Sequence, residues 1–160
     1  METKTTGAGP GVHVFDQSLQ TANTWIHEIM TELHSENAQE ALQALRAVLH
    51  LLRDRLPAAE AVHLGGQLPL LVAGLYFNGF QLRDKPIKYD RNEFLQQIAQ
   101  NLSANNVRNP DPMRYMYAVV RVITRRISQG QSQQIEGSLP EDLRQLWRMF
   151  EQGQMPAAAA

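Results

Sequence analysis

Residues 44–76, ALRAVLHLLRDRLPAAEAVHLGGQLPLLVAGLY, align without a gap onto residues 115–147, YMYAVVRVITRRISQGQSQQIEGSLPEDLRQLW, at a constant offset of 71. The identical pairs include Ala47 and Ala118, Val48 and Val119, Arg55 and Arg126, Gly66 and Gly137, Leu68 and Leu139, Pro69 and Pro140, and Leu75 and Leu146. Upstream the offset becomes 69, and Trp25 then matches Phe94. A unit of about 70 residues with several short helices buries its apolar face against its copy, so the repeat predicts an internally duplicated fold.

The apolar spacing within each copy predicts four helices and no strand. Apolar residues recur every three or four positions near the N-terminus, which predicts an amphipathic first helix with one buried stripe. They are Phe15, Leu19, Ala22, Ile26, Ile29 and Leu33. Asn37 with Glu40 is typical of a capping box that opens the second helix, and Asp90 with Glu93 of one that opens the fifth. The consecutive glycines 65 and 66 are expected to end the third helix.

The predicted architecture is therefore an all-α domain of about eight helices, built from two tandem four-helix repeats with pseudo-twofold symmetry. The domain is expected over residues 14–150, with repeat one at 14–80 and repeat two at 85–150. Residues 1–13 and 151–160 are expected to be a disordered N-terminal segment and a disordered C-terminal tail, because the ends of a domain are poorly ordered unless they are tied down.

The composition limits the class of protein. The chain has 160 residues, of which 43% are hydrophobic and 19% charged, an ordinary globular composition. It has no cysteine, which excludes thiol catalysis, thiolate metal sites and disulfides, and makes a reducing cytoplasm the default location. No run approaches 18 continuous apolar residues, so no membrane association is expected.

The charges are unevenly divided along the chain. Residues 1–80 hold four Lys and Arg against eight Asp and Glu, whereas residues 81–160 hold eleven against eight. This asymmetry has two interpretations. The charges could orient a partner or a head-to-tail self-contact, or they could simply be scattered over a solvated surface.

Several motifs together resemble one known family. They are ALRAVLHLLRDRL at 44–56, LGGQLPLLVAG at 64–74, YFNGF at 76–80 and LPEDLRQLW at 139–147. At these spacings the chain, over about residues 14–150, resembles the bacterial family called domain of unknown function 2267. The resemblance implies an all-helical, internally duplicated bacterial cytoplasmic domain, and it implies no particular activity.

No catalytic, metal or cofactor site is predicted. Glu60 and His63 have the i, i+3 spacing of helical diiron sites, but the matching positions of the second copy are Gln131 and Gln134. His50 stands between leucines without a nucleophile beside it, which favours a partly buried ring with a backbone hydrogen bond over a general base. The sequence therefore predicts a protein that is not an enzyme and needs no cofactor.

Arginines on the sixth helix are one candidate partner-binding site. Arg114, Arg121 and Arg125 lie seven and four residues apart on one helix face, with Arg126 alongside. They would meet phosphates or an acidic partner, or they form the solvated face of a helix whose other side is core. Nucleic acid is not the expected partner, because the sequence pI is about 6.5 and no nucleic-acid-binding motif is present.

Aromatic residues at the junction of the two copies are the other candidate. Tyr76, Phe77 and Phe80 would form an anchor for a partner or line a small-molecule cleft, or they seal the copies together.

Taken together, these features predict a non-catalytic protein-interaction, regulatory or adaptor module. Its partner would be another protein or a second copy of the chain in a homodimer. The alternative is a small-molecule sensor with a pocket at the repeat interface, and an enzyme is the third possibility.

Overall fold

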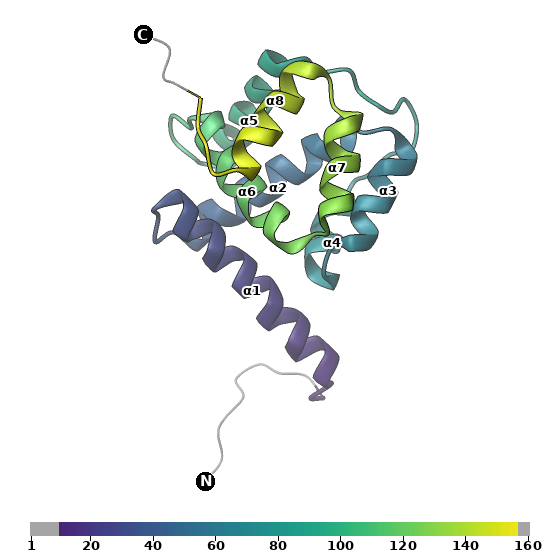
Figure 1. The fold of residues 1–160 in the computed structure, drawn as a ribbon. Helices are drawn as coiled ribbons and strands as arrows, with labels where there is room; N and C mark the ends of the chain where they lie inside the picture. The colour runs from purple at the N-terminus through teal and green to yellow at the C-terminus, as the bar shows by residue number, and fades with distance from the viewer. Residues whose placement is uncertain (1–9, 157–160) are drawn as a thin grey trace.

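The computed structural model describes residues 10–156 of the chain. Within this range the backbone forms eight α-helices and no β-strand, which confirms the predicted all-α fold (Figure 1). The helices are α1 (His13–Leu33), α2 (Ala38–Arg55), α3 (Ala58–Gln67), α4 (Leu70–Phe77), α5 (Arg91–Ala104), α6 (Pro112–Arg126), α7 (Gln129–Ser138) and α8 (Glu141–Glu151). None of these described helices combines the length and apolar content needed to cross a membrane. Of the end segments expected to be disordered, 1–13 and 151–160, residues 1–9 and 157–160 lie outside the described range, while His13 begins α1 and Glu151 ends α8.

Helices α2 and α6 form the centre of the molecule. Helix α2 contacts α1, α3, α4, α5 and α6, and α6 also contacts α1, α5 and α8. Helices α3 and α7 lie side by side (Figure 1). The largest core side chains are almost fully buried, at 1% exposure or less: Trp25, Tyr76, Phe94, Trp147 and Phe150. Burial of one such side chain stabilises the fold by about 1.5–3 kcal/mol, so this core carries most of the stability.

Side-chain caps fix the starts of α2 and α5 where the sequence predicts them. The Asn37 carboxamide oxygen accepts two backbone N–H groups of the first turn of α2, at 3.0 and 3.2 Å, and Asp90 accepts one at 2.9 Å at the start of α5. The reciprocal bond of the predicted capping box, in which the backbone N–H of Asn37 would donate to the Glu40 side chain, is replaced by other contacts. Glu40 accepts hydrogen bonds from Ser35 Oγ and Tyr115 Oη, because α6 brings that tyrosine against it.

The prediction that the two glycines end α3 is wrong, because the helix continues through Gln67. The helix ends before Pro69 instead, where Leu68 is extended as residues preceding proline usually are. Gly65 has a packing role, since a Cβ at this position would lie 2.1 Å from Cζ of Phe77. The glycine lets the Phe77 ring lie directly on the backbone of α3.

The predicted burial of the whole α1 stripe is also wrong. Ile29 and Leu33 are completely buried, but Phe15 is 62% exposed and Leu19 is 56% exposed. The stripe is continuous in sequence, whereas the N-terminal half of α1 projects beyond the other described helices (Figure 1). Only the C-terminal half of the stripe is therefore covered.

Candidate interaction site

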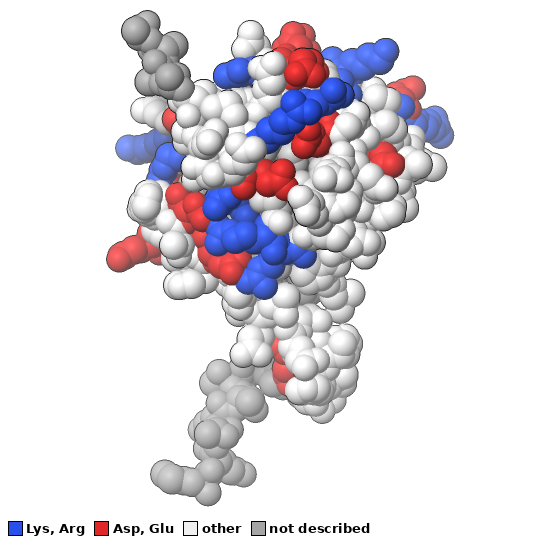
Figure 2. Space-filling view, viewed as in Figure 1, with Lys and Arg blue, Asp and Glu red and all other residues white. Residues whose placement is uncertain are grey.

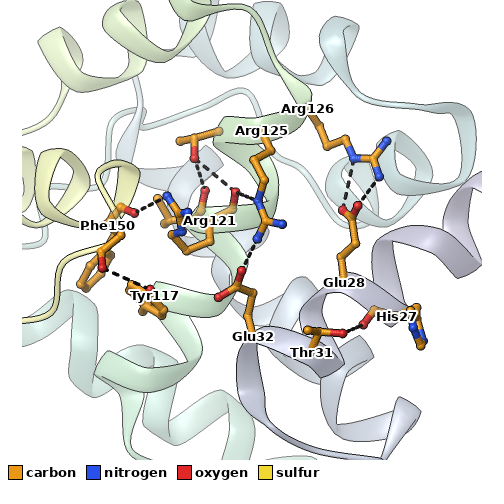
Figure 3. A network of polar contacts seen from close by, with 12 residues as sticks. His27, Glu28, Thr31, Glu32, Tyr117, Arg121, Arg125, Arg126 and Phe150 are labelled. Atoms are coloured by element: carbon orange, nitrogen blue, oxygen red, sulfur yellow. Dashed lines mark hydrogen bonds and ion pairs between the residues drawn. The ribbon is translucent and has the colours of Figure 1, made fainter.

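Two of the predicted arginines join α6 to α1. Arg126 Nε donates to one oxygen of Glu28 at 3.2 Å while its Nη2 contacts the other, and Arg125 pairs with Glu32 (Figure 3). The Arg125 and Arg126 side chains are 43% and 36% exposed. Acids of the negative half of the chain thus meet bases of the positive half, so part of the sequence asymmetry is matched within the molecule.

The other two arginines bind the carbonyl ends of helices. Arg121 Nη1 donates to the backbone oxygens of Phe150 at 3.3 Å and Glu151 at 2.7 Å, at the end of α8 (Figure 3). Arg114 donates to the oxygen of Leu33, the last residue of α1. Helix C-termini carry unpaired carbonyls and partial negative charge, which a guanidinium satisfies. All four arginines therefore have partners inside the molecule, and their contact with an outside partner stays a prediction.

The three junction aromatics pack against one another and against the chain. Tyr76 is fully buried, and its hydroxyl donates to the oxygen of Ala61 at 2.5 Å. Burial raises the pKa of Tyr76 well above its ordinary value. The Phe77 ring lies edge-on to Tyr76 at 5.0 Å and to Phe80 at 6.0 Å between centroids, and Phe77 remains 37% exposed. This arrangement closes α4 onto α3 and leaves part of one ring at the surface.

A buried charge cluster beside these rings was not predicted as a site. Arg53 is only 6% exposed, and its Nη1 donates to the backbone oxygens of Tyr76 at 2.5 Å and Asn78 at 2.7 Å. Its Nε is 3.1 Å from Asp54, which also accepts from Lys85 at 2.9 Å. Lys85 lies in the linker between α4 and α5, residues 78–90. The cluster therefore ties the end of α4 and the linker to α2. A cation inside the apolar stripe of the second helix is the signal that could have revealed it.

His50 takes the role that the sequence predicts. Its Nε2 is 2.7 Å from the backbone oxygen of Leu75, and the ring is half-buried. Because that oxygen only accepts, the neutral ring carries its proton on Nε2. Burial lowers the pKa of His50 below its ordinary value, and the charge of Arg53 adds to this effect. The ring thus links α2 to α4 in its neutral form.

An apolar groove lies next to the uncovered stripe of α1. It has a volume of about 390 Å³ and lies between α1, α2 and α4. Its lining is Ala22, Asn23, Ile26, Ala38, Gln39, Leu42, Leu45, Leu71, Val72 and Leu75. We call the combined surface the α1–α4 face and define it by Phe15, Leu19, Ala22, Ile26, Leu71 and Leu75. Figure 2 shows the projecting part of α1 almost without Lys, Arg, Asp or Glu.

Comparison with known proteins places the chain in a family. A family model described as "Uncharacterized conserved protein (DUF2267)" matches residues 22–146. The chain belongs to the DUF2267 family. A search of the curated proteins found no match.

The DUF2267 match divides the α1–α4 face. The lining of the groove and the four α6 arginines lie inside the matched residues, whereas Phe15 and Leu19 precede them. The groove therefore belongs to the family region, and the exposed residues next to it lie on the part of α1 that the match does not include.

A polar hollow is the second concave feature of this DUF2267 protein. It measures about 770 Å³ and lies between the α1–α2 connection with the first turn of α2, and the α5–α6 connection with the first turn of α6. Its lining is His34, Ser35, Asn37, Gln39, Glu40, Asn105, Asn106, Val107, Arg108, Arg114 and Tyr115. At its wall Glu40 accepts hydrogen bonds from Ser35 at 3.0 Å and Tyr115 at 2.7 Å, with Arg114 at 3.9 Å. Burial, together with the hydrogen bond to Glu40, raises the pKa of Tyr115 to about 12. The hollow is thus polar and joins residues from both halves of the chain.

The motif weighed for metal binding remains an isolated pair. Glu60 and His63 both lie on α3. Across residues 10–156, no group of three or more His, Asp or Glu side chains is placed to share a metal ion.

Proposed function

We propose that this protein is a non-catalytic protein-interaction or adaptor module, and that the α1–α4 face is its docking surface. The observation that carries the proposal is the exposure of Phe15 and Leu19 beside an apolar groove. Soluble proteins rarely leave a contiguous apolar patch uncovered, and such patches mark interaction sites. The groove offers a hollow into which an apolar side chain of a partner fits.

The arginines of α6 contribute to this function by position. Arg125 and Arg126 attach to Glu32 and Glu28, on the flank of α1 that packs beside α6. They hold the helix that carries Phe15 at a fixed angle to the body, so the docking surface is formed before a partner arrives. Such preorganisation lowers the entropic cost of binding.

Internal duplication is part of the proposal, and paired contacts support it. Tyr76 donates its hydroxyl to Ala61. Their counterparts in the repeat alignment are Trp147 and Ser132, and Trp147 donates its indole N–H to Ser132 at 3.0 Å. His50 bonds a carbonyl of α4, and Arg121, the counterpart of His50, bonds the end of α8.

One pair differs in chemistry between the proposed copies. Gly65 and Phe77 correspond to Glu136 and Arg148, which form an ion pair. An aromatic ring on a glycine in one half thus takes the place of a charge pair in the other, and in both halves the contact links the short helix to the one after it.

A cytoplasmic location is part of the same proposal. A chain without cysteine gains no disulfide from an oxidising compartment, which fits the bacterial cytoplasm. Fractionation of the native host with an antibody against the protein tests this location.

Capture from lysate of the native host, with nuclease present, tests the docking surface. We expect the wild-type chain to retain protein partners that the F15E variant loses, because a carboxylate in the apolar face cannot be buried without cost. The matched control is L82E, since Leu82 is 65% exposed, lies in the linker between α4 and α5, and is not one of the residues that define the face. Retention of the same proteins by F15E and the wild-type chain would overturn the proposed surface.

The polar hollow is the observation that favours the alternative, a small-molecule sensor. A ligand in it would meet Glu40, Tyr115 and Arg114, which suit a small molecule with both cationic and acidic groups. Thermal melting with a panel of free amino acids tests this function, because a ligand that binds only the folded state raises Tm. A shift that Y115F abolishes would favour the sensor.

A further inference from the structure

The apolar stripe of α1 changes from buried to exposed along one helix. Ile29 is fully buried, Ile26 is partly buried, and Leu19 and Phe15 are 56% and 62% exposed. All four lie on one side of the helix, because they recur at intervals of three, four and seven residues. The exposed half is therefore a direct extension of a surface that already packs against other helices.

The charge of this surface restricts its partner. Asp16 is the single charged residue among Lys, Arg, Asp and Glu from residue 12 to residue 26, and the groove lining contains none. A strongly charged partner, such as a nucleic acid or an acidic peptide, would find no complementary charges here. A partner with an equally apolar, uncharged helix face leaves no charge unpaired.

The face is complementary to itself. In an antiparallel pair of helices, residues equally far from the twofold axis lie opposite each other. An axis beside Gln20 brings Phe15 of one copy between the partner's Ala22 and the partner's Ile26, the two apolar residues of α1 that line the groove. A large exposed ring in one protomer thus meets a hollow in the other, and the twofold axis makes this contact twice.

The polar flank of α1 agrees with the same geometry. Asp16, Asn23 and His27 line one shallow hollow along the helix, together with apolar Leu19. A twofold axis that crosses an antiparallel pair places like flanks together, so Asp16 lies within one helical turn of the partner's His27. This contact gives a carboxylate a hydrogen-bond donor and leaves no like charges opposed.

We propose that the occupant of the α1–α4 face is a second copy of this chain, paired through antiparallel α1 helices with Phe15 of each protomer in the groove of the other. This inference rests on the proposed function, since it names the partner of the same surface.

The available area sets the strength of the dimer. Residues 12–26 span about 22 Å of helix. With the adjoining side of α4 the face is about 20 Å wide, since packed helices lie 8–10 Å apart. Such a face buries about 500–600 Å² on each partner, at the low end for specific association. Interfaces of this size are typical of weak, transient pairs, so we expect a dissociation constant in the micromolar range.

Sedimentation equilibrium of the full chain, between about 1 and about 300 µM, brackets such a dissociation constant. We expect a monomer–dimer equilibrium that F15E weakens at least tenfold, with its melting temperature unchanged because Phe15 touches little in the monomer. L82E serves as the control, and its dimerisation should equal that of the wild-type chain.

Cross-linking tests the axis itself. Because the chain has no cysteine, L19C places the single thiol near the axis and L82C places one in the linker. Mild oxidation should convert L19C to a disulfide dimer at least ten times faster than L82C.

A chain that stays monomeric at about 300 µM, or a dimer that F15E leaves intact, overturns the self-pairing. If the chain is monomeric while F15E still loses a captured host protein, the docking surface stands and only the identity of its partner changes. If F15E affects neither measurement, both proposals fail.

Discussion

The ring of Phe77 lies on the backbone of Gly65, so closely that a Cβ on residue 65 would be 2.1 Å from Cζ and 2.4 Å from Cε2 of the ring. The contact packs α4 against α3 through van der Waals contact between the ring and the backbone of α3. It also makes residue 65 a position where the usual preference of helices for alanine over glycine is reversed.

We expect G65A to destabilise the protein by about 1–2 kcal/mol. The new methyl group displaces the Phe77 ring, and the packing free energy lost exceeds the gain of about 1 kcal/mol from helix propensity. G66A is the matched control, since nothing lies within 4 Å of a Cβ there, and it should stabilise by about 0.5–1 kcal/mol. Urea unfolding measures both. In the F77A background G65A should become stabilising, and a cost that persists there would contradict the steric explanation.

Replacement of the buried cation should be costly. R53M removes the donor to the oxygens of Tyr76 and Asn78, and we expect a loss of about 2–4 kcal/mol in the free energy of unfolding. R83A removes an exposed arginine of the linker turn and should change this free energy by less than about 0.5 kcal/mol. Equal stabilities of the two variants in denaturant unfolding would show that the cluster does not hold α4.

Stability should fall as the solution becomes acidic, in part through His50. Its pKa in the folded protein is lowered, so below the ordinary value of 6.5 the unfolded chain binds a proton that the folded protein does not. The stabilisation is complete above about pH 6.5 and is lost as the pH falls toward the folded pKa. Unfolding free energies at several pH values should show a smaller slope in H50Q, which keeps an N–H donor for Leu75. An unchanged slope would assign the effect to other groups.

The ion pair between α6 and α1 should tolerate a swap of its two charges between the helices. R126E opposes Glu28 with a like charge, and we expect faster hydrogen exchange in α1 with a global loss of at most about 1 kcal/mol, because exposed pairs contribute little. The double variant E28R/R126E restores the pair with reversed sign and should recover slow exchange. If it does not, the pair has a role other than attachment of α1.

Sequence periodicity identified the residues that form the core, because a spacing of three to four positions reports which side of a helix is apolar. The caps at Asn37 and Asp90 were likewise predictable, since they act on the next few residues. Periodicity does not report how far neighbouring helices extend. The exposure of Phe15 and Leu19 therefore could not be predicted from it.

The partners of the arginines could not be predicted from the sequence for a different reason. Arg125 and Glu32 are 93 positions apart, and no local pattern pairs them. Arg53 was missed because the alignment of residues 44–76 with 115–147 places Thr124 opposite it, so this buried cation looks like chance variation. Positions that differ between two aligned segments thus deserve the same weight as positions that they share.

The pairs Phe77 on Gly65 and Arg148 with Glu136 make the two short-helix hairpins respond to their surroundings in opposite ways. Concentrated salt screens the ion pair between α7 and α8, whereas it leaves the contact of the Phe77 ring with α3 unchanged or strengthens it. Cooling weakens the apolar contact and spares the charged one. Salt and cooling therefore act on different contacts, and neither change weakens both.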